Sequence, residues 1–450
     1  MAKKKNKQRD LQGKQAVLER IKLNAAGIDI GSESLFIAVL DKPVMKFTTF
    51  TDGLKQAVVY LKECVVTSVA MEATGIYWFP IYEFLEQAGI EVYVVNGRHA
   101  KNVPGRKTDV LDSEWLRELH TYGLLRSSFV PTESIRKLRY YVRLRKDHIT
   151  MGASHIQHIQ KNLDAMNIKL HTVISDIMGD SGLKVLRAIL AGERNPEALL
   201  LLCHITIREK KAENVIKSLE GNYREEYLFG LRQALEMWEV YQRKIFDCDK
   251  EIEKLLKEMT QENLVMQDSS NPKVMMHNKP EIKDLHLLMM KLTQGKDPTQ
   301  IAGINDYTLM QLISEIGTDL GNWPTSDHFT SWLGLAPSQN KSGKQNKTGK
   351  RKKRKVNRAG SIFKQIAMSV GNGKYSALSG FYKRIKSRSG APTANKATAR
   401  KIAVYFYNLM TRGFSFVEEG LKRYEERYKE HQLKSLQKRA KEMGLQLVVA

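Results

Sequence analysis

The sequence predicts an α/β N-terminal domain, a helical middle segment with a coiled coil, and a mostly α-helical C-terminal domain. Short apolar runs and helical segments alternate through residues 24–130, as they do in an α/β domain. Long segments with few turn residues follow from Ser134, and a highly basic region begins after Pro298. A length of 450 residues is typical of about three domains. We expect a basic arm at 1–23, an α/β domain at 24–130, a helical coiled-coil domain at 131–295, a C-terminal domain at 296–425 and a terminal helix at 426–450.

The first predicted strand carries Asp29. In the segment AGIDIGSESLFIAVLD, Ile28 and Ile30 flank this residue in alternation, so its carboxylate points to the opposite face of a buried strand. The next two residues turn the chain into a second strand at 35–40. Glu72 ends a third apolar run, TSVAMEATG, and emerges at a strand tip before the aromatic helix IYWFPIYEFLEQAG.

The run IEVYVV reads as a further strand, and the segment DVLDSEWLRELH begins a helix. Asp109 and Asp112 share one face of its first turn, where carboxylates also cap free amides and oppose the helix dipole. The order strand, hairpin, strand, helix, strand, helix is that of an RNase H-like fold, in which carboxylates from such elements meet. The sequence therefore predicts an RNase H-like domain in which Asp29, Glu72, Asp109 and Asp112 hold Mg²⁺ or another divalent metal.

The composition indicates a polyanionic partner. The chain has 73 Lys and Arg against 49 Asp and Glu, a formal net charge of +24, and such a surface attracts phosphate backbones. No apolar run approaches the roughly 18 residues of a spanning helix, so we expect no membrane partner. The basic start MAKKKNKQR lacks a following apolar segment, and the three cysteines form no CxxC pair. We therefore expect a cytoplasmic, nucleoid-associated protein without a disulfide framework or a zinc site.

The middle segment shows a heptad pattern from Leu228 to Met259. Eight of its ten a and d positions are apolar, and the exceptions, Gln242 and Asp249, are candidates for setting register or oligomeric state. Both a dimeric coiled coil and a helical hairpin within one chain produce this pattern. Three histidines, at positions 148, 155 and 158, can share a helix face, where contact with nucleic acid or packing in the seam is favoured over metal binding.

The C-terminal domain combines a possible DNA-binding turn with a basic segment. Its first part, IAGINDYTLMQLISEIG, resembles a helix-hairpin-helix element, whose glycine turn can present amides to a phosphate. From Lys341 to Arg358, ten of eighteen residues are Lys or Arg and none is acidic, a composition that a localisation tract shares. Ser342 precedes Gly343 and Lys344 there. A serine beside a flexible glycine and several cations can attack a phosphodiester, but most Ser-Gly pairs are turns.

Several motifs follow in order between about residue 24 and residue 425: GIDIGS, MEATGIYWFP, VVNGRHAKNVPGRKTDVLDSEWL, GLLRSSFVP, SWLGLAPSQNKSGK and NRAGSIFKQIA. With them the chain resembles the bacterial insertion-sequence transposases of the IS110 family, and most of all its IS1111 group. The resemblance implies a RuvC-like N-terminal domain whose Asp-Glu-Asp-Asp motif falls on Asp29, Glu72, Asp109 and Asp112, and a serine nucleophile at Ser342.

The resemblance also implies a reaction and its partners. The serine would form a transient covalent link to DNA, which conserves the phosphodiester energy without ATP. Donor and target DNA would pair with a structured noncoding guide RNA from the element itself, in contact with basic helices such as SIRKLRYYVRLRK. The active form would be a homo-oligomer, a dimer or a tetramer, in which one chain's serine can meet another chain's carboxylates.

The loop around the serine departs from the family pattern. Many relatives have two glycines after the serine, whereas Lys344 follows Gly343 directly here, so Ser338 is the alternative nucleophile. The candidate nucleic-acid contacts are basic residues of two loops: Arg106, Lys107, Lys344, Lys347, Lys350, Arg351, Lys352 and Arg354.

The sequence also bears on four other functions. A metal-dependent Holliday-junction resolvase or nuclease would use the carboxylates alone, without a covalent intermediate. An actin-like ATPase requires a second glycine-rich phosphate loop, yet the chain contains no Gly-Gly pair. A noncatalytic nucleic-acid binder would not need Asp29 or Ser342. A tyrosine recombinase would use Tyr424 or Tyr428, but their spacing is that of an amphipathic surface helix.

Overall fold

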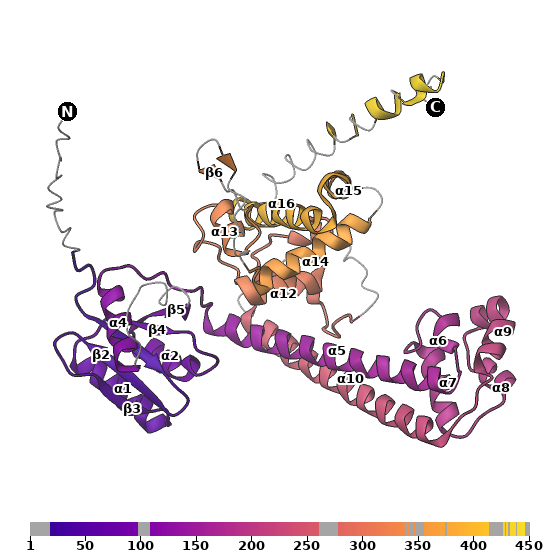
Figure 1. Cartoon of the computed structure of the whole chain (residues 1–450), viewed down its shortest axis with the longest axis horizontal. Coiled ribbons are helices and arrows are strands. Elements are labelled where there is room, and N and C mark those ends of the chain that lie inside the picture. Colours follow the sequence, from indigo (N-terminus) through magenta and orange to yellow (C-terminus); the bar gives the residue numbers. More distant parts are fainter. Residues whose placement is uncertain are drawn as a thin grey trace, which may run out of the picture. The chain divides into compact units, whose positions relative to one another are not determined.

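The computed structural model describes most of the chain. The described residues are 19–97, 109–260, 278–337, 341–342, 345–346, 355–373, 376–413 and parts of 426–445. The chain forms two compact units, Met1–Val130 and Pro131–Ala450. Figure 1 shows a sheet with helices in the first unit and helices almost throughout the second. No helix among the described residues combines the length and the apolar character that crossing a bilayer requires.

The first unit is built on a mixed five-stranded sheet in the order β3-β2-β1-β4-β5. Its strands are β1 (Ala25–Ile30), β2 (Ser34–Val39), β3 (Met45–Thr48), β4 (Ser68–Glu72) and β5 (Glu91–Val95). The first three strands pair antiparallel, and β1, β4 and β5 pair parallel. Among the described residues, three helices accompany the sheet: α1 (Thr51–Glu63), α2 (Trp78–Gln87) and α4 (Asp109–Thr121). This mixed sheet with helices agrees with the expected α/β RNase H-like class, and β3 and α1 are the elements that the sequence analysis did not identify.

The two faces of the sheet have different cores. Ile28 and Ile30 of β1 are buried in a large apolar cluster with residues of α1 and α2, such as Leu54 and Ile81. The opposite face carries a smaller cluster in which Ala70 and Val95 of the sheet pack against Leu116 and Leu119 of α4. Since side chains alternate along a strand, the odd-numbered residues of β1 and the even-numbered residues of β4 face α4.

The C-terminal end of α4 is fixed to the start of β4 by a buried hydrogen bond. His120 Nε2 lies 3.0 Å from Ser68 Oγ. The imidazole stacks obliquely on Tyr93, whose ring also carries the ammonium group of Lys22 at 3.8 Å. Burial disfavours the imidazolium and the Lys22 charge repels it, which together lower the pKa of His120 to about 4.

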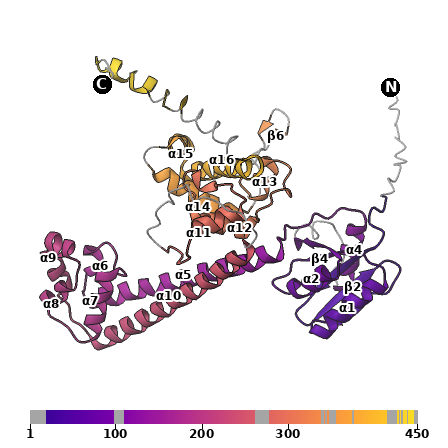
Figure 2. The same ribbon diagram turned by 180° about the vertical axis from the view of Figure 1, so that it is seen from behind.

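The second unit begins with a long helical hairpin. Helix α5 (Glu133–Ala165) and helix α10 (Glu225–Met259) run side by side in both views (Figure 2). Their contacts prove an antiparallel arrangement, because Arg145 pairs with Asp249, Gly152 lies against Tyr241, and Gly230 lies against Asn162. Four shorter helices lie between them in the sequence: α6 (Leu170–Val173), α7 (Asp180–Leu190), α8 (Pro196–Leu201) and α9 (Ile205–Leu219).

The heptad positions of α10 are covered by α5 of the same chain. Six of the ten predicted seam positions are buried, whereas Gln242 is exposed. Tyr241 stacks on His155 at 5.5 Å between ring centroids and lies 5.9 Å from His148, so these two histidines pack in the seam. The pattern is therefore explained by the hairpin, without a second copy of the chain.

Asp249, the other polar seam position, is buried in an ion pair. Arg145 donates from Nε and Nη2 to its two carboxylate oxygens at 2.5 and 3.1 Å, and both residues are about 1 % exposed. The same guanidinium lies 4.9 Å from the centroid of the Tyr307 ring. Burial alone would lower the pKa of Arg145, but the hydrogen bond and charge of Asp249 and the interactions with Tyr307 together outweigh it, and the net pKa is raised.

The remainder of the second unit is a helical body. Its elements are α11 (Leu285–Leu292), the 3₁₀ turn η1 (Pro298–Gln300), α12 (Asp306–Ile316), α13 (Ser326–Trp332), the hairpin of β6 (Lys341–Ser342) and β7 (Gln345–Asn346), α14 (Arg358–Asn372), α15 (Ala377–Ser389) and α16 (Ala391–Arg412). Phe329 of α13 is fully buried at its centre, within 6.5 Å of the rings of Trp323, Phe363, Phe406 and Tyr407. The aromatic cluster thus joins α13, α14 and α16 into one core.

Two arginines of α5 anchor the hairpin to this body. Arg139 donates to the carbonyl oxygens of Ser314 and Glu315 at the end of α12, at 3.0 and 2.8 Å. Arg143 binds the Glu315 carboxylate through two hydrogen bonds of 2.8 and 2.7 Å. Cations at a helix C-terminus also oppose its dipole. Arg139 and Arg143, like Arg145, thus make contacts within the chain, which leaves less of the predicted RNA-binding helix SIRKLRYYVRLRK available to a partner.

The buried ion pair should respond differently to single and double replacement. Arg145→Leu leaves the Asp249 carboxylate buried without its partner and should reduce the free energy of unfolding of the second unit by about 3 to 5 kcal/mol. The double variant with Asp249→Leu should lose less, since no charge remains buried. Urea denaturation followed by far-ultraviolet circular dichroism measures both. The exposed pair of Arg187 and Glu239 provides the control, and Arg187→Leu should cost less than about 1 kcal/mol. Equal losses in the single and double variants would contradict this account.

Acid should destabilise the first unit through His120. Its pKa is about 4 in the folded chain and 6.5 when exposed, so between these values the unfolded chain binds a proton that the folded chain does not. Stability is therefore complete above pH 6.5 and falls by about 3 kcal/mol as the pH approaches 4. His120→Asn, which keeps a hydrogen-bonding group but does not titrate, should flatten this dependence. Urea unfolding read by pulsed hydrogen exchange of β4 peptides tests it, with exposed His158→Asn as the control; an unchanged slope in His120→Asn would disprove the assignment.

Candidate active site

Two of the four predicted carboxylates come from neighbouring strands in the same register. β1 and β4 are parallel, and Ile28 pairs with Met71, so the next step along this register brings Asp29 beside Glu72. Both side chains belong to the sheet face that α4 covers. Neighbouring strands are roughly 4.8 Å apart, so the two carboxylates start from adjacent backbone positions. Both residues are half-buried, which leaves them accessible from solvent.

Helix α4 reaches the sheet because Gly27 has no side chain. A Cβ atom at this position would overlap the carbonyl oxygen of Ser113 and the backbone nitrogen of Arg117. The helix crosses from His120 at the start of β4 to Ser113 above the middle of β1. Its first turn therefore points toward the carboxyl ends of β1 and β4, where Asp29 and Glu72 lie.

Asp112 belongs to that first turn and is half-buried. Asp109 is the first residue of α4, but its side chain lies outside the described part of the structure. The loop basic residues Arg106 and Lys107 are likewise outside the described residues. The structure thus brings Asp29 and Glu72 together and directs the start of α4 toward them.

Gly97 is a site residue that sequence reasoning missed. It follows β5, and a Cβ atom there would overlap the carboxylate of Glu72. The bare backbone at Gly97 therefore allows the Glu72 side chain to occupy its position. The sequence signal was a glycine two residues after a strand, which usually indicates only a turn.

The chemistry of this set fits a hard divalent cation. Its donors are carboxylate oxygens, the ligands that Mg²⁺ takes from proteins. Among the side chains that the structure describes, no three His, Cys, Asp or Glu residues converge as a complete metal site. The side chain of Asp109, the remaining predicted ligand, lies outside the described part of the structure.

The predicted nucleophile lies on a small hairpin in the second unit. Lys341 pairs with Asn346 and Ser342 with Gln345, so Ser342 is the last residue of β6. Its side chain, like residue Ser338 as a whole, is outside the described part of the chain. The predicted phosphate contacts of this loop also lie outside the described residues: Lys344, Lys347, Lys350, Arg351, Lys352 and Arg354.

The predicted DNA-binding turn before α12 is packed against the body of the second unit. Gly303 has a φ of +85°, and a Cβ atom there would overlap the side chains of Ile366 and Val370 of α14. Asn305 caps α12 by accepting a hydrogen bond from the Thr308 backbone nitrogen at 2.9 Å. A glycine is required here for packing as well as for the turn. This packing explains the glycine without any contact to nucleic acid.

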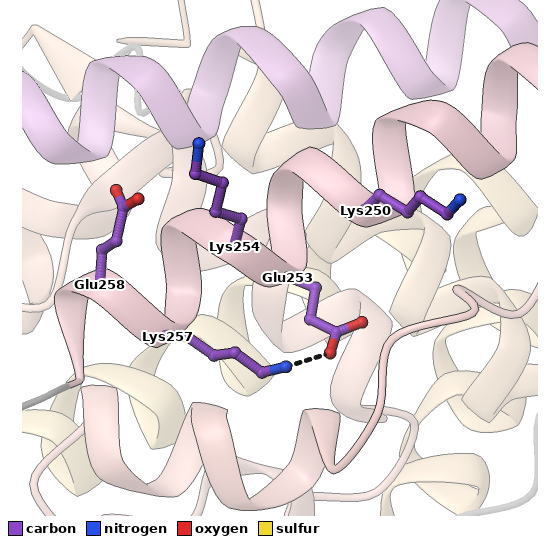
Figure 3. A pocket seen from close by; sticks show the side chains of 5 residues that line it. All are labelled: Lys250, Glu253, Lys254, Lys257 and Glu258. Atoms are coloured by element: carbon purple, nitrogen blue, oxygen red, sulfur yellow. Dashed lines mark hydrogen bonds and ion pairs between the residues drawn. The ribbon is translucent and has the colours of Figure 1, made fainter.

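A shallow hollow of about 440 Å³ on α10 differs from the predicted metal site in its lining, which contains both lysines and glutamates. It is lined by Lys250, Glu253, Lys254, Lys257 and Glu258, all from one helix, and Lys257 donates to Glu253 at 2.5 Å (Figure 3). The lining mixes three lysines with two glutamates along the helix face, and the pair of Glu253 and Lys257 has i,i+4 spacing. It therefore offers no cluster of carboxylates.

Two family models match the chain. Residues 26–168 match a DEDD transposase of the IS110 type, and residues 299–383 match the transposase of the IS116/IS110/IS902 family. Together these segments cover slightly more than half of the sequence. The first contains all four predicted carboxylates, and the second contains Ser342. No curated protein matches the chain.

Gly97→Ala should weaken divalent-metal binding while leaving the fold intact. The added methyl group overlaps the Glu72 carboxylate and forces it away from Asp29. Calorimetric titration with Mn²⁺ should show an affinity loss of roughly tenfold or more, the scale seen when a metal ligand loses its support. The thermal midpoint should remain near that of the wild type. Gly373→Ala, at a glycine whose added Cβ would meet only Val370 of its own helix, is the control; equal Mn²⁺ affinities in both variants would remove Gly97 from the site.

Proposed function

Because the chain belongs to the IS116/IS110/IS902 family of transposases and is thus a DNA transposase, we propose that it exchanges DNA strands through a covalent link at Ser342, assisted by metal held at Asp29, Glu72, Asp109 and Asp112. The observation that carries this proposal is the adjacency of Asp29 and Glu72 beneath the first turn of α4. The DEDD family match indicates dependence on a divalent metal, and the oxygen-only ligand set favours Mg²⁺.

The proposed reaction conserves phosphodiester bonds. The Ser342 hydroxyl oxygen bonds to phosphorus and loses its proton, while the bond from phosphorus to a deoxyribose oxygen breaks and that oxygen takes up a proton. Attack by another strand's hydroxyl on the phosphoserine then restores the serine and forms the new phosphodiester. Bound metal would supply Lewis acidity to the phosphoryl oxygens. The cations from Lys344 to Arg354 would stabilise the charge that develops on phosphorus.

We further propose a noncoding guide RNA and a homo-oligomer, as in the family that the sequence resembles. Arg139, Arg143 and Arg145 make contacts within the chain, so on α5 the RNA would contact other residues, such as exposed Tyr140 and Lys146. DNA binding that persists unchanged after complete RNase digestion would argue against this part of the proposal.

Covalent trapping tests the central claim. Incubation with element-end DNA, the candidate RNA and Mg²⁺ should yield a protein–DNA adduct that survives denaturing electrophoresis, with the DNA mapped to Ser342. Ser342→Ala should abolish the adduct, Ser338→Ala should retain it, and Asp29→Asn should slow its formation on the order of a hundredfold. Strand cleavage without any adduct would instead favour the metal-dependent resolvase or nuclease.

Mixing two inactive variants tests whether the site is shared between chains. If one chain's serine acts with another chain's carboxylates, a mixture of Ser342→Ala and Asp29→Asn proteins should recover adduct formation. Neither variant should form the adduct at the normal rate by itself. A mixture as inactive as its components would place both groups in the same chain.

A further inference from the structure

The loop after Glu72 and the first turn of α2, together called the apolar loop, expose three large apolar side chains. Ile76 is 75 % exposed, Tyr77 46 % and Phe79 40 %. The segment from Ala73 to Pro80 contains no charged residue, in a chain of net charge +24. Exposed aromatic residues that cluster in one short loop usually bind a partner.

This apolar loop is held rigidly. Trp78 packs against the main core of the first unit and stacks on Phe79, with ring centroids 4.1 Å apart. It also meets Tyr82 edge to face at 5.5 Å. Backbone hydrogen bonds from Tyr77 to Thr74 and from Phe79 to Ile76 close the turn at 3.2 Å each. Exposed rings on a rigid base lose little conformational entropy when they bind.

The loop also adjoins the carboxylates. It leaves β4 directly after Glu72, where the Ala73 nitrogen donates to the Val95 oxygen at 3.0 Å and the Thr74 nitrogen to the Glu72 oxygen at 2.9 Å. Helix α2 then begins at Trp78, six residues after Glu72. Ile76 and Tyr77 lie only four and five positions after Glu72, so DNA whose phosphate is bound through metal at Asp29 and Glu72 would have a neighbouring base within reach of this segment.

We propose that Ile76, Tyr77 and Phe79 form a stacking surface for an unpaired DNA base beside the phosphodiester at the acidic cluster. This inference rests on the proposed function. It names an unpaired base as the part of the substrate that the first unit recognises. The three residues act as positioning residues, since they contact the base rather than the reacting phosphorus.

The chemistry of the loop favours a base over the other parts of a nucleic acid. Phosphate and sugar are bound by cations and hydrogen-bond donors, which the side chains of the loop largely lack. The faces of bases are apolar and stack on aromatic rings regardless of sequence. Strand exchange unpairs bases next to the scissile bond, and a ring surface at that point would lower the cost of keeping a base out of the stack.

The test measures binding, so it does not depend on cleavage. The full-length protein is titrated, with Ca²⁺ in place of Mg²⁺ to occupy the carboxylates, with a DNA duplex that contains an unpaired thymine loop and one 2-aminopurine, and with the same duplex carrying abasic sites in the loop. Stacking should quench the 2-aminopurine. Tyr77→Leu and Phe79→Leu should weaken binding of the base-containing loop by roughly 5- to 100-fold. Neither variant should change binding of the abasic loop.

Three controls make the result decisive. Tyr77→Phe keeps the ring and should retain the affinity, and Phe229→Leu removes a ring from α10 that is 65 % exposed and should have no effect. Equal losses on base-containing and abasic DNA, or no loss on either, would overturn the proposal. A loss seen only with the corresponding RNA loop would assign the surface to RNA. Altered sedimentation of Tyr77→Leu with intact DNA binding would assign it to a second copy of the chain.

Discussion

The geometry of the candidate active site depends on the close approach of α4 to β1 at Gly27. The helix backbone occupies the space that a side chain at this position would need, so the first turn of α4 and the tips of β1 and β4 are held by the core itself. Carboxylates supplied by such elements are positioned more accurately than carboxylates on loops. Gly97 acts in the same way one strand further on, by leaving room for the Glu72 carboxylate.

The register of the hairpin in the second unit depends on a buried ion pair. Arg145 joins α5 to Asp249 of α10 and to Tyr307 of α12, and nearby Arg139 and Arg143 bind the end of α12. A buried ion pair contributes little net stability, because desolvation offsets most of the attraction. Its main effect is specificity: only one register of the hairpin places the guanidinium opposite the carboxylate. This explains an aspartate at a seam position that would otherwise be apolar.

Local patterns predicted the strands and the order of elements in the first unit, because alternation and strand tips are readable within a few residues. The edge strand Met45–Thr48 is largely exposed and lacks an apolar face, so its pattern is weak. The heptads predicted a coiled coil but not its partner. The arginines of α5 resembled a nucleic-acid surface because their partners, such as Glu315 and Asp249, lie more than a hundred positions away in sequence. The role of Gly97 depends on a contact with Glu72 across two strands.

The hairpin of α5 and α10 also has the properties of an adjustable spacer. Because its helices are antiparallel, the residue numbers of two facing positions add up to nearly the same value along the hairpin, from Arg145 with Asp249 to Asn162 with Gly230. Removal of one heptad from each helix, between these two contacts, preserves the facing of the remaining seam. The length of the hairpin sets the distance between the helical body and the far end of the hairpin. This length can therefore change during evolution while the folds at the two ends stay the same.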